Sequence, residues 1–124
     1  MNTFHVNASF VLQNFFPTFL NLPSDNSLDL KYYNDKLGEP TKHWCLIAEI
    51  VEVVPHFRPM LKLKDKAGRV FLVTCYFDYE QGMPHEWTKH ARKGNSLSIM
   101  YAEKHVSMDG QQGIRLEDVE RVKV

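Results

Sequence analysis

The chain has 124 residues, of which 44% are hydrophobic and 12% are aromatic, enough for a packed core and too apolar for a globally disordered chain. Its 15 basic residues are balanced by 15 acidic ones, whereas a dedicated duplex-DNA binder usually carries a basic excess, because phosphate neutralisation supplies most of its affinity. Neutrality therefore disfavours a nucleic-acid binder without excluding one, since charge can still be segregated on one face.

Neither a targeting segment nor a membrane span is expected. The amino terminus has no basic segment followed by an apolar run, and the most apolar early stretch, residues 10–22, is interrupted by polar residues and a proline. Cys45 and Cys75 both lie in apolar runs, where buried free thiols are favoured over a disulfide. We expect an intracellular protein, cytoplasmic or nuclear, without membrane association.

The chain divides into an N-terminal arm, residues 1–41, and a β-rich part, residues 42–124. The arm mixes turn-forming residues with five phenylalanines, which are Phe4, Phe10, Phe15, Phe16 and Phe19. Aromatic rings are costly to leave in water, so the arm is expected to pack on the barrel, with a partner-binding surface as the alternative. A short helix is predicted over residues 28–36.

Residues 44–54 form the first predicted strand, and two carboxylates interrupt its apolar pattern. Glu49 and Glu52 are three positions apart, so strict alternation would place them on opposite faces. A β-bulge between them restores both to the outside, as a strongly coiled barrel requires of its first strand.

The next two predicted strands are joined by a tight turn. Residues 60–64 alternate, with leucines inward and lysines outward, and residues 65–68 form the turn, in which Gly68 is free to adopt positive φ. Residues 69–76 return as a nearly continuous apolar strand, a pattern typical of a strand covered on both faces.

The hydrophobic period then changes, and a helix is predicted over residues 84–94, between a proline that suits its first turn and a glycine that ends it. Two further strands follow, residues 96–103 and residues 113–124, joined by a hairpin tip at residues 109–110, and the second is expected to break near Asp118. Three strands, a helix and two strands predict a mainly β fold. It is a five-stranded OB-like barrel whose helix, between strands three and four, plugs one end.

Several short runs in residues 42–124, taken together, resemble a domain common in fungal proteins. These runs are Lys42-His43-Trp44, Glu49-Ile50-Val51, Phe57-Arg58-Pro59, Asp65-Lys66-Ala67-Gly68, Tyr76-Phe77-Asp78, Lys93-Gly94-Asn95-Ser96-Leu97, Tyr101-Ala102-Glu103-Lys104-His105, Asp109-Gly110, Gly113-Ile114-Arg115-Leu116-Glu117-Asp118 and Val122-Lys123-Val124. In that family the domain often precedes a MYND-type zinc finger, a cysteine-rich protein-interaction module, and this chain stops where the finger would follow. The resemblance implies the OB-like fold and a binding role in a larger adaptor-type protein, and it implies no reaction.

The sequence carries no pattern typical of a catalytic or metal site. Among its six histidines, His85 and His90 are five apart and would lie well around a helix from one another, which makes them a poor chelating pair. No Cys-x-x-Cys pair, nucleophile elbow or phosphate loop occurs. We expect a non-enzymatic protein without a metal or cofactor.

An OB barrel binds its ligands across strands two and three, between the loop joining strands one and two and the loop joining strands four and five. Here those loops are residues 55–59, held by two prolines, and residues 104–112. The candidate ligand-binding residues on this face are His56, Phe57, Arg58, Lys62, Lys64, Arg69, Lys104, His105 and Met108.

This face admits three interpretations. Docking of a protein or peptide, the leading hypothesis, is favoured by the neutral charge and the aromatic-rich arm. The alternative ligand is a single-stranded nucleic acid, held by stacking on Phe57 and by the surrounding cations. The third interpretation is an ordinary solvated face, with Phe57 packed inward.

Charged residues late in the chain are expected to pair across neighbouring strands. Glu103, Arg115 and Glu117 are placed for such ion pairs, which contribute under about 1 kcal/mol each when exposed and set register more than stability. Arg58 is expected either to act at the binding face or to pair with a buried carboxylate such as Glu103.

Overall fold

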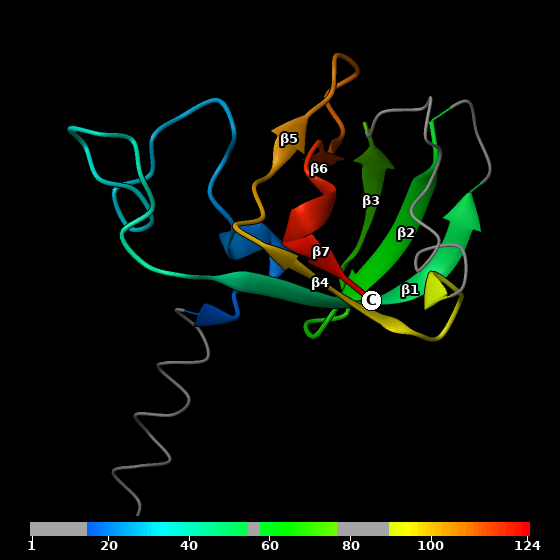
Figure 1. Cartoon of the computed structure of the whole chain (residues 1–124). Helices are drawn as coiled ribbons and strands as arrows, with labels where there is room; N and C mark the ends of the chain where they lie inside the picture. The colour runs from blue at the N-terminus through cyan, green and yellow to red at the C-terminus, as the bar shows by residue number, and fades with distance from the viewer. Residues whose placement is uncertain (1–14, 55–57, 77–89) are drawn as a thin grey trace, which may run out of the picture.

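The structure is a computed structural model that describes residues 15–54, 58–76 and 90–124. In these residues the chain is mainly β, with seven strands in one sheet and two short 3₁₀ helices, η1 and η2 (Figure 1). The elements are η1 (Phe19–Asn21), β1 (Cys45–Val54), β2 (Met60–Asp65), β3 (Val70–Cys75), β4 (Ser96–Met100), β5 (His105–Val106), β6 (Gln112–Leu116), η2 (Val119–Arg121) and β7 (Val122–Lys123).

The sheet has the strand order β5-β6-β3-β2-β1-β4-β7 and curls back on itself. β1, β2 and β3 form an antiparallel meander, β3 pairs in parallel with β6, and β4 pairs with the other side of β1. Because β4 and β5 follow one another along the chain, a short stretch of backbone joins β5, at one end of the strand order, to β4, next to the last strand at the other end. The mainly β prediction is confirmed, and the pairing has the connectivity of an OB barrel.

The strand count differs from the predicted five for two reasons. The predicted fourth strand, residues 96–103, ends as β4 before Tyr101, which adopts a positive φ of 55°, and a short extra strand, β5, forms within the predicted loop over residues 104–112. The last breaks after β6, as predicted near Asp118, and resumes as β7 beyond η2. Most of the predicted helix over residues 84–94 lies outside the described residues. Its described end is helical only at His90, so the helix does not continue to Gly94.

β1 contains the predicted bulge. The register against β2 shifts between Ile50 and Glu52, and this shift places Glu49 opposite Lys64 and Glu52 opposite Lys62. Both glutamates are exposed, as predicted, and each pairs with the lysine opposite, at 3.9 Å for Glu49 and 3.5 Å for Glu52. Exposed pairs of this kind fix the register of the two strands more than they stabilise the fold.

The predicted turn between β2 and β3 is confirmed, with Gly68 at a φ of 85°. The expectation that β3 is covered on both faces is wrong. Phe71, Val73 and Cys75 are buried, whereas the side chains between them on the outer face, Leu72 and Thr74, are only half-buried. No second layer covers that outer face among the described residues, and it is left open as a groove.

Residues of the arm complete the core of the barrel. The Phe19 ring stacks on Phe71 with centroids 4.3 Å apart and planes 6° apart, and Phe19 is 1% exposed. Two tyrosines of the arm, Tyr32 and Tyr33, pack on the buried Trp44. Residues 15–41 therefore cover the rings of Trp44 and Phe71, which residues 42–124 alone would leave partly exposed.

The predicted helix over residues 28–36 is wrong, because these residues form turns. The side-chain oxygen of Asp29 accepts a hydrogen bond from the Lys31 amide, and that of Asn34 accepts one from the Lys36 amide. Asp and Asn side chains that bind nearby amides in this way compete with the helical hydrogen bonds of the backbone.

A buried carboxylate joins the arm to the turn between β2 and β3. Asp65 is 5% exposed and accepts hydrogen bonds from the backbone amides of Phe19 at 2.8 Å, Ala67 at 3.0 Å and Arg69 at 2.9 Å. The amides of Ala67 and Arg69 shape the turn, and the amide of Phe19 holds η1 against the sheet. A charged acceptor bonded by several amides is a strong tether.

The two cysteines are buried and are not joined by a disulfide, as predicted. Burial raises the pKa of the Cys75 thiol to about 12 and also raises that of the Cys45 thiol. Both thiols therefore stay protonated near neutral pH, the form that is neither a nucleophile nor a metal ligand.

Replacing Gly113 with alanine is expected to lower the free energy of unfolding by about 1–3 kcal/mol, the usual cost of forcing extra atoms into a packed site. A Cβ atom at Gly113 would lie 2.6 Å from the carbonyl oxygen of Leu72, its parallel partner on β3, and backbone cannot yield without parting the strands. Urea denaturation followed by circular dichroism measures the loss. Gln112→Ala, an exposed change on the same strand, is the control, and equal midpoints for the two variants would contradict the prediction.

Candidate binding groove

The outer face of β2, β3 and β6 is hollowed beneath the loop that joins β5 to β6. The first hollow has a volume of about 420 Å³, and its floor is formed by the outward side chains of Met60, Leu72 and Thr74 and by Gly113. Ser107, Met108, Asp109 and Gln111 of the loop line the hollow as a wall. Because Gly113 has no side chain, the floor stays low where β3 and β6 run side by side.

The phase of β3 decides which side chains reach this floor. Alternation with the buried Phe71, Val73 and Cys75 turns Leu72, Thr74 and, just past the strand, Tyr76 to the outer face. The floor is therefore a half-buried apolar strip that ends in an aromatic ring.

Tyr76 lies beside two arginines from distant parts of the chain. The guanidinium carbon of Arg58, just before β2, and that of Arg115, on β6, each lie 4.1 Å from the centre of the Tyr76 ring. Nε of Arg115 also pairs with Glu117 at 2.8 Å. Guanidinium groups at this distance from a ring make favourable cation–π contacts and hold two cations at this end of the groove.

A second hollow of about 480 Å³ continues the first along the same face. The two hollows share Leu72, Gln111 and Gln112, and the second is also lined by Phe19 of η1 and by the cations Lys62 and Arg69. Together the hollows form one groove that runs from Tyr76 at one end to η1 at the other. We refer to both hollows as the groove.

The structure brings some of the predicted site residues to this groove and not others. His105 and Met108 line its first hollow, Lys62 and Arg69 line its second, and Arg58 reaches its end through Tyr76. Of the other four, His56 and Phe57 lie outside the described residues. Lys64 and Lys104 do not line the groove: Lys64 pairs with Glu49, and Lys104 donates to the carbonyl oxygen of Leu20 at 2.9 Å.

Two residues at the groove were missed from the sequence. The sequence predicts Tyr76 at the end of a strand that is covered on both faces. Its even spacing from Leu72 and Thr74, however, places all three side chains on one face. Arg115 was assigned to ion pairing alone, because nothing local shows that β6 lies parallel to β3.

The predicted cross-strand ion pairs are corrected by the structure. Arg115 pairs with Glu117 two residues along its own segment, while Glu103 accepts a hydrogen bond from the Tyr33 hydroxyl. Burial raises the pKa of Glu103, and the Tyr33 hydrogen bond partly offsets the shift. The proposed Arg58–Glu103 pair is not formed, since Arg58 lies over Tyr76 instead.

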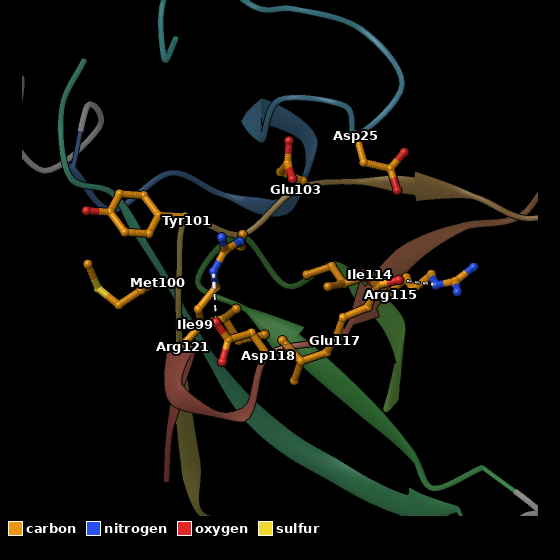
Figure 2. A pocket seen from close by; sticks show the side chains of 12 residues that line it. Asp25, Ile99, Met100, Tyr101, Glu103, Ile114, Arg115, Glu117, Asp118 and Arg121 are labelled. Atoms are coloured by element: carbon orange, nitrogen blue, oxygen red, sulfur yellow. Dashed lines mark ion pairs between the residues drawn. The ribbon is translucent and has the colours of Figure 1, made fainter. Parts of the chain in front are cut away.

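A separate pocket of about 210 Å³ lies where β4 and β6 diverge, and its lining is acidic. Figure 2 shows Arg121 directed toward Tyr101 and Glu103, while Arg115 extends the other way. Both arginines are paired, Arg115 with Glu117 and Arg121 with Asp118 at 3.9 Å (dashed lines in Figure 2). The carboxylates that line this pocket are Asp25, Glu103, Glu117 and Asp118.

Two properties of the described residues bear on metal binding and on membrane spanning. Within residues 15–54, 58–76 and 90–124, histidine, cysteine and carboxylate side chains nowhere form a group of three or more that could hold a metal ion. None of the helices in the described part of the chain is long and apolar enough to cross a membrane.

Comparison with known proteins finds similarity only at the level of structure. No family model matches the chain, and no curated protein matches it in sequence. Among solved structures, Pot1pC of Schizosaccharomyces pombe bound to ssDNA is similar with a TM-score of 0.47 and 7% identity, over 74% of this chain and 84% of that one. The S. pombe Stn1-Ten1 complex is similar with a TM-score of 0.47 and 16% identity, over 88% of this chain and 76% of that one.

Proposed function

We propose that this domain is a non-catalytic binding module whose groove holds single-stranded nucleic acid. The observation that carries the proposal is the Tyr76 ring with two arginines at one end of a half-buried apolar strip. Single strands are held without sequence reading by aromatic rings that stack on bases and by cations that follow the phosphates. The groove has both components on one face, and because guanidinium groups already lie over the Tyr76 ring, a base would stack there in place of one of them or on its plane.

The distribution of charge supports this choice over the neutral total. Arg115, Lys62 and Arg69 line the groove, and Asp109 is the only carboxylate among the described residues that line it. Carboxylates gather instead at the pocket between β4 and β6. A chain with no net charge therefore presents a basic groove, as a phosphate-binding face requires.

The ion pairs at the groove do not remove its attraction for phosphate. Lys62 pairs with Glu52 at 3.5 Å, and both side chains are about half exposed. Exposed pairs of this kind contribute at most about 1 kcal/mol, so a phosphate can replace the carboxylate at small cost. Arg115 uses its Nε toward Glu117, and a guanidinium carries four further N–H groups on its terminal nitrogens.

Replacing Tyr76 with alanine is expected to weaken binding of a mixed-sequence oligonucleotide by about 1–3 kcal/mol, the usual contribution of one stacked base. Fluorescence anisotropy with a labelled strand, at low and moderate salt, measures the change. Tyr76 is outside the barrel core, so the melting temperature should move little. Lys123→Ala, on β7, is the control and should bind like the unchanged protein. An unchanged protein that binds no strand even at low salt would rule out the function, because genuine binding tightens steeply as salt falls.

A protein or peptide partner is the second candidate, and one observation favours it. Leu28, Leu30 and Leu37 of the arm are 50%, 65% and 72% exposed, and apolar side chains gathered on one segment are typical of docking surfaces. Changing the three to serine should abolish recovery of a partner in a pull-down and leave oligonucleotide affinity unchanged. Loss of oligonucleotide binding in that variant would show that the exposed leucines and the groove are not separate binding surfaces.

A further inference from the structure

A basic pocket adjoins η1, which also borders the groove. Its volume is about 410 Å³, and three lysines line it: Lys31 of the arm, Lys42 at the start of the β-rich part and Lys104 just before β5. Its other lining residues are Leu20, Asn21, Leu22, Asp29 and Tyr32. Asp29 is the single carboxylate among the described residues that line it. We call this site the lysine pocket.

Two of the three lysines, Lys42 and Lys104, are held by ring and backbone contacts. Lys104 donates from Nζ to the carbonyl oxygen of Leu20 at 2.9 Å, and Nζ of Lys42 lies 4.8 Å from the centre of the Tyr32 ring. The Tyr32 hydroxyl in turn donates to the carbonyl oxygen of Asn21 at 2.9 Å. These contacts reduce the entropy that Lys42 and Lys104 would lose on binding an anion.

The backbone on either side of Lys104 fixes the arm to the sheet at this point. The Lys104 amide donates to the carbonyl oxygen of Pro23 at 2.7 Å, and the Asp25 amide donates to that of Lys104 at 2.9 Å. The carboxylate of Asp29 is engaged as well, since its Oδ1 accepts the Lys31 amide at 2.9 Å. The pocket is therefore a built feature of the arm–barrel junction with an excess of positive charge.

The lysine pocket continues the groove across a single ridge. Phe19 lines the second hollow of the groove, and the next three residues, Leu20 to Leu22, line the lysine pocket. η1 thus separates two neighbouring basic depressions, the one with Lys62 and Arg69 and the other with the three lysines. A strand that leaves the groove at Phe19 reaches the lysine pocket by crossing η1.

We propose that the lysine pocket binds backbone phosphates of the same single strand after it leaves the groove. This inference rests on the proposed function and extends it, since it assigns a second contact region outside the β2-β3-β6 face. Ammonium groups suit phosphate as point charges without base recognition. The groove would stack bases, and the lysine pocket would add affinity through charge alone.

The test compares short and long strands on the double variant Lys31→Ala/Lys42→Ala, in which Lys104 and its bond to Leu20 are kept. A strand of about four nucleotides fits the groove alone, whereas one of about twelve can also reach the lysine pocket, within the range of known OB site sizes. The double variant should bind the long strand roughly ten- to thirty-fold more weakly at about 0.1 M salt, with a salt slope lower by about 1.4. Its affinity for the short strand should not change.

Two controls separate contact from general charge. Lys36→Ala/Lys123→Ala removes the same net charge elsewhere and should leave the length dependence intact. Lys31→Arg/Lys42→Arg keeps the charges and should restore the salt slope. Equal weakening of short and long strands would overturn the inference in favour of a long-range field, and so would an unchanged slope.

The same titrations distinguish failure of this inference from failure of the proposed function. If the unchanged protein binds the strands, Tyr76→Ala lowers the affinity and the lysine variants bind normally, the proposed function of the groove is supported. The lysine pocket is then not a phosphate site. If the unchanged protein binds neither strand at low salt, both proposals are wrong.

Discussion

Replacing Asp65 with alanine is expected to lower the free energy of unfolding by about 3–5 kcal/mol, among the larger losses that a single change to this domain should cause. Asp65 is 5% exposed and accepts three backbone amides, two in its own turn and one from Phe19. Water can replace the carboxylate at the two turn amides, which are part-buried. The Phe19 amide is buried, and without its acceptor it bears the full cost of an unsatisfied donor.

Urea denaturation at neutral pH measures this loss, and two further variants serve as comparisons. Asp65→Asn keeps one side-chain oxygen and should lose less than alanine, because the remaining acceptor is neutral. Asp29→Ala removes a comparable turn hydrogen bond at a more exposed position and should cost under about 1 kcal/mol. An Asp65→Ala variant as stable as Asp29→Ala would show that the arm is held by its rings alone.

Features set by neighbouring residues in the chain were predictable from the sequence. The β1 bulge follows from the spacing of Glu49 and Glu52, and the turn after β2 follows from Gly68, since period and positive φ are local properties. The arm turns were missed for a local reason too. A helix was predicted over residues 28–36, whereas the Asp29 and Asn34 side chains bind amides of the turns instead.

Features set by pairing between distant residues were not predictable. The position of Arg115 beside Tyr76 depends on the parallel register of β3 and β6, which no local pattern of residues 112–116 reveals. Lys104 was expected on the binding face because it begins the loop between strands four and five. The predicted fourth strand ends early, before Tyr101 at positive φ, and Lys104 bonds instead to Leu20 of the arm.

The difference between features set by chain neighbours and features set by distant pairing explains why the sequence predicts only part of the candidate site. The sequence predicts the loops and the cations of an OB face, because these follow from strand order. It cannot show that arm residues 19–22 border the groove on one side and the lysine pocket on the other, since that depends on how the arm folds back. The arm is thus part of the proposed binding surface as well as part of the core.

Replacing Phe19 with alanine is expected to lower the free energy of unfolding by about 3–5 kcal/mol, the range for a large aromatic side chain removed from a core. The ring is 1% exposed and stacks on Phe71 with a centroid distance of 4.3 Å, so its removal leaves a cavity against β3. Thermal and urea unfolding measure the loss. Phe15→Ala, at a ring that is 37% exposed, is the matched control and should cost far less.

The double variant Phe19→Ala/Asp65→Ala decides whether ring and carboxylate act together. Both hold the same segment, the ring through Phe71 and the carboxylate through the Phe19 amide at 2.8 Å. If loss of either releases η1 from the sheet, the second change has little left to remove, and the double variant should lose clearly less than the two single losses added. Strictly additive losses would mean that η1 stays in place when one tether is cut. Since η1 borders both the groove and the lysine pocket, the released arm should also weaken long strands more than short ones.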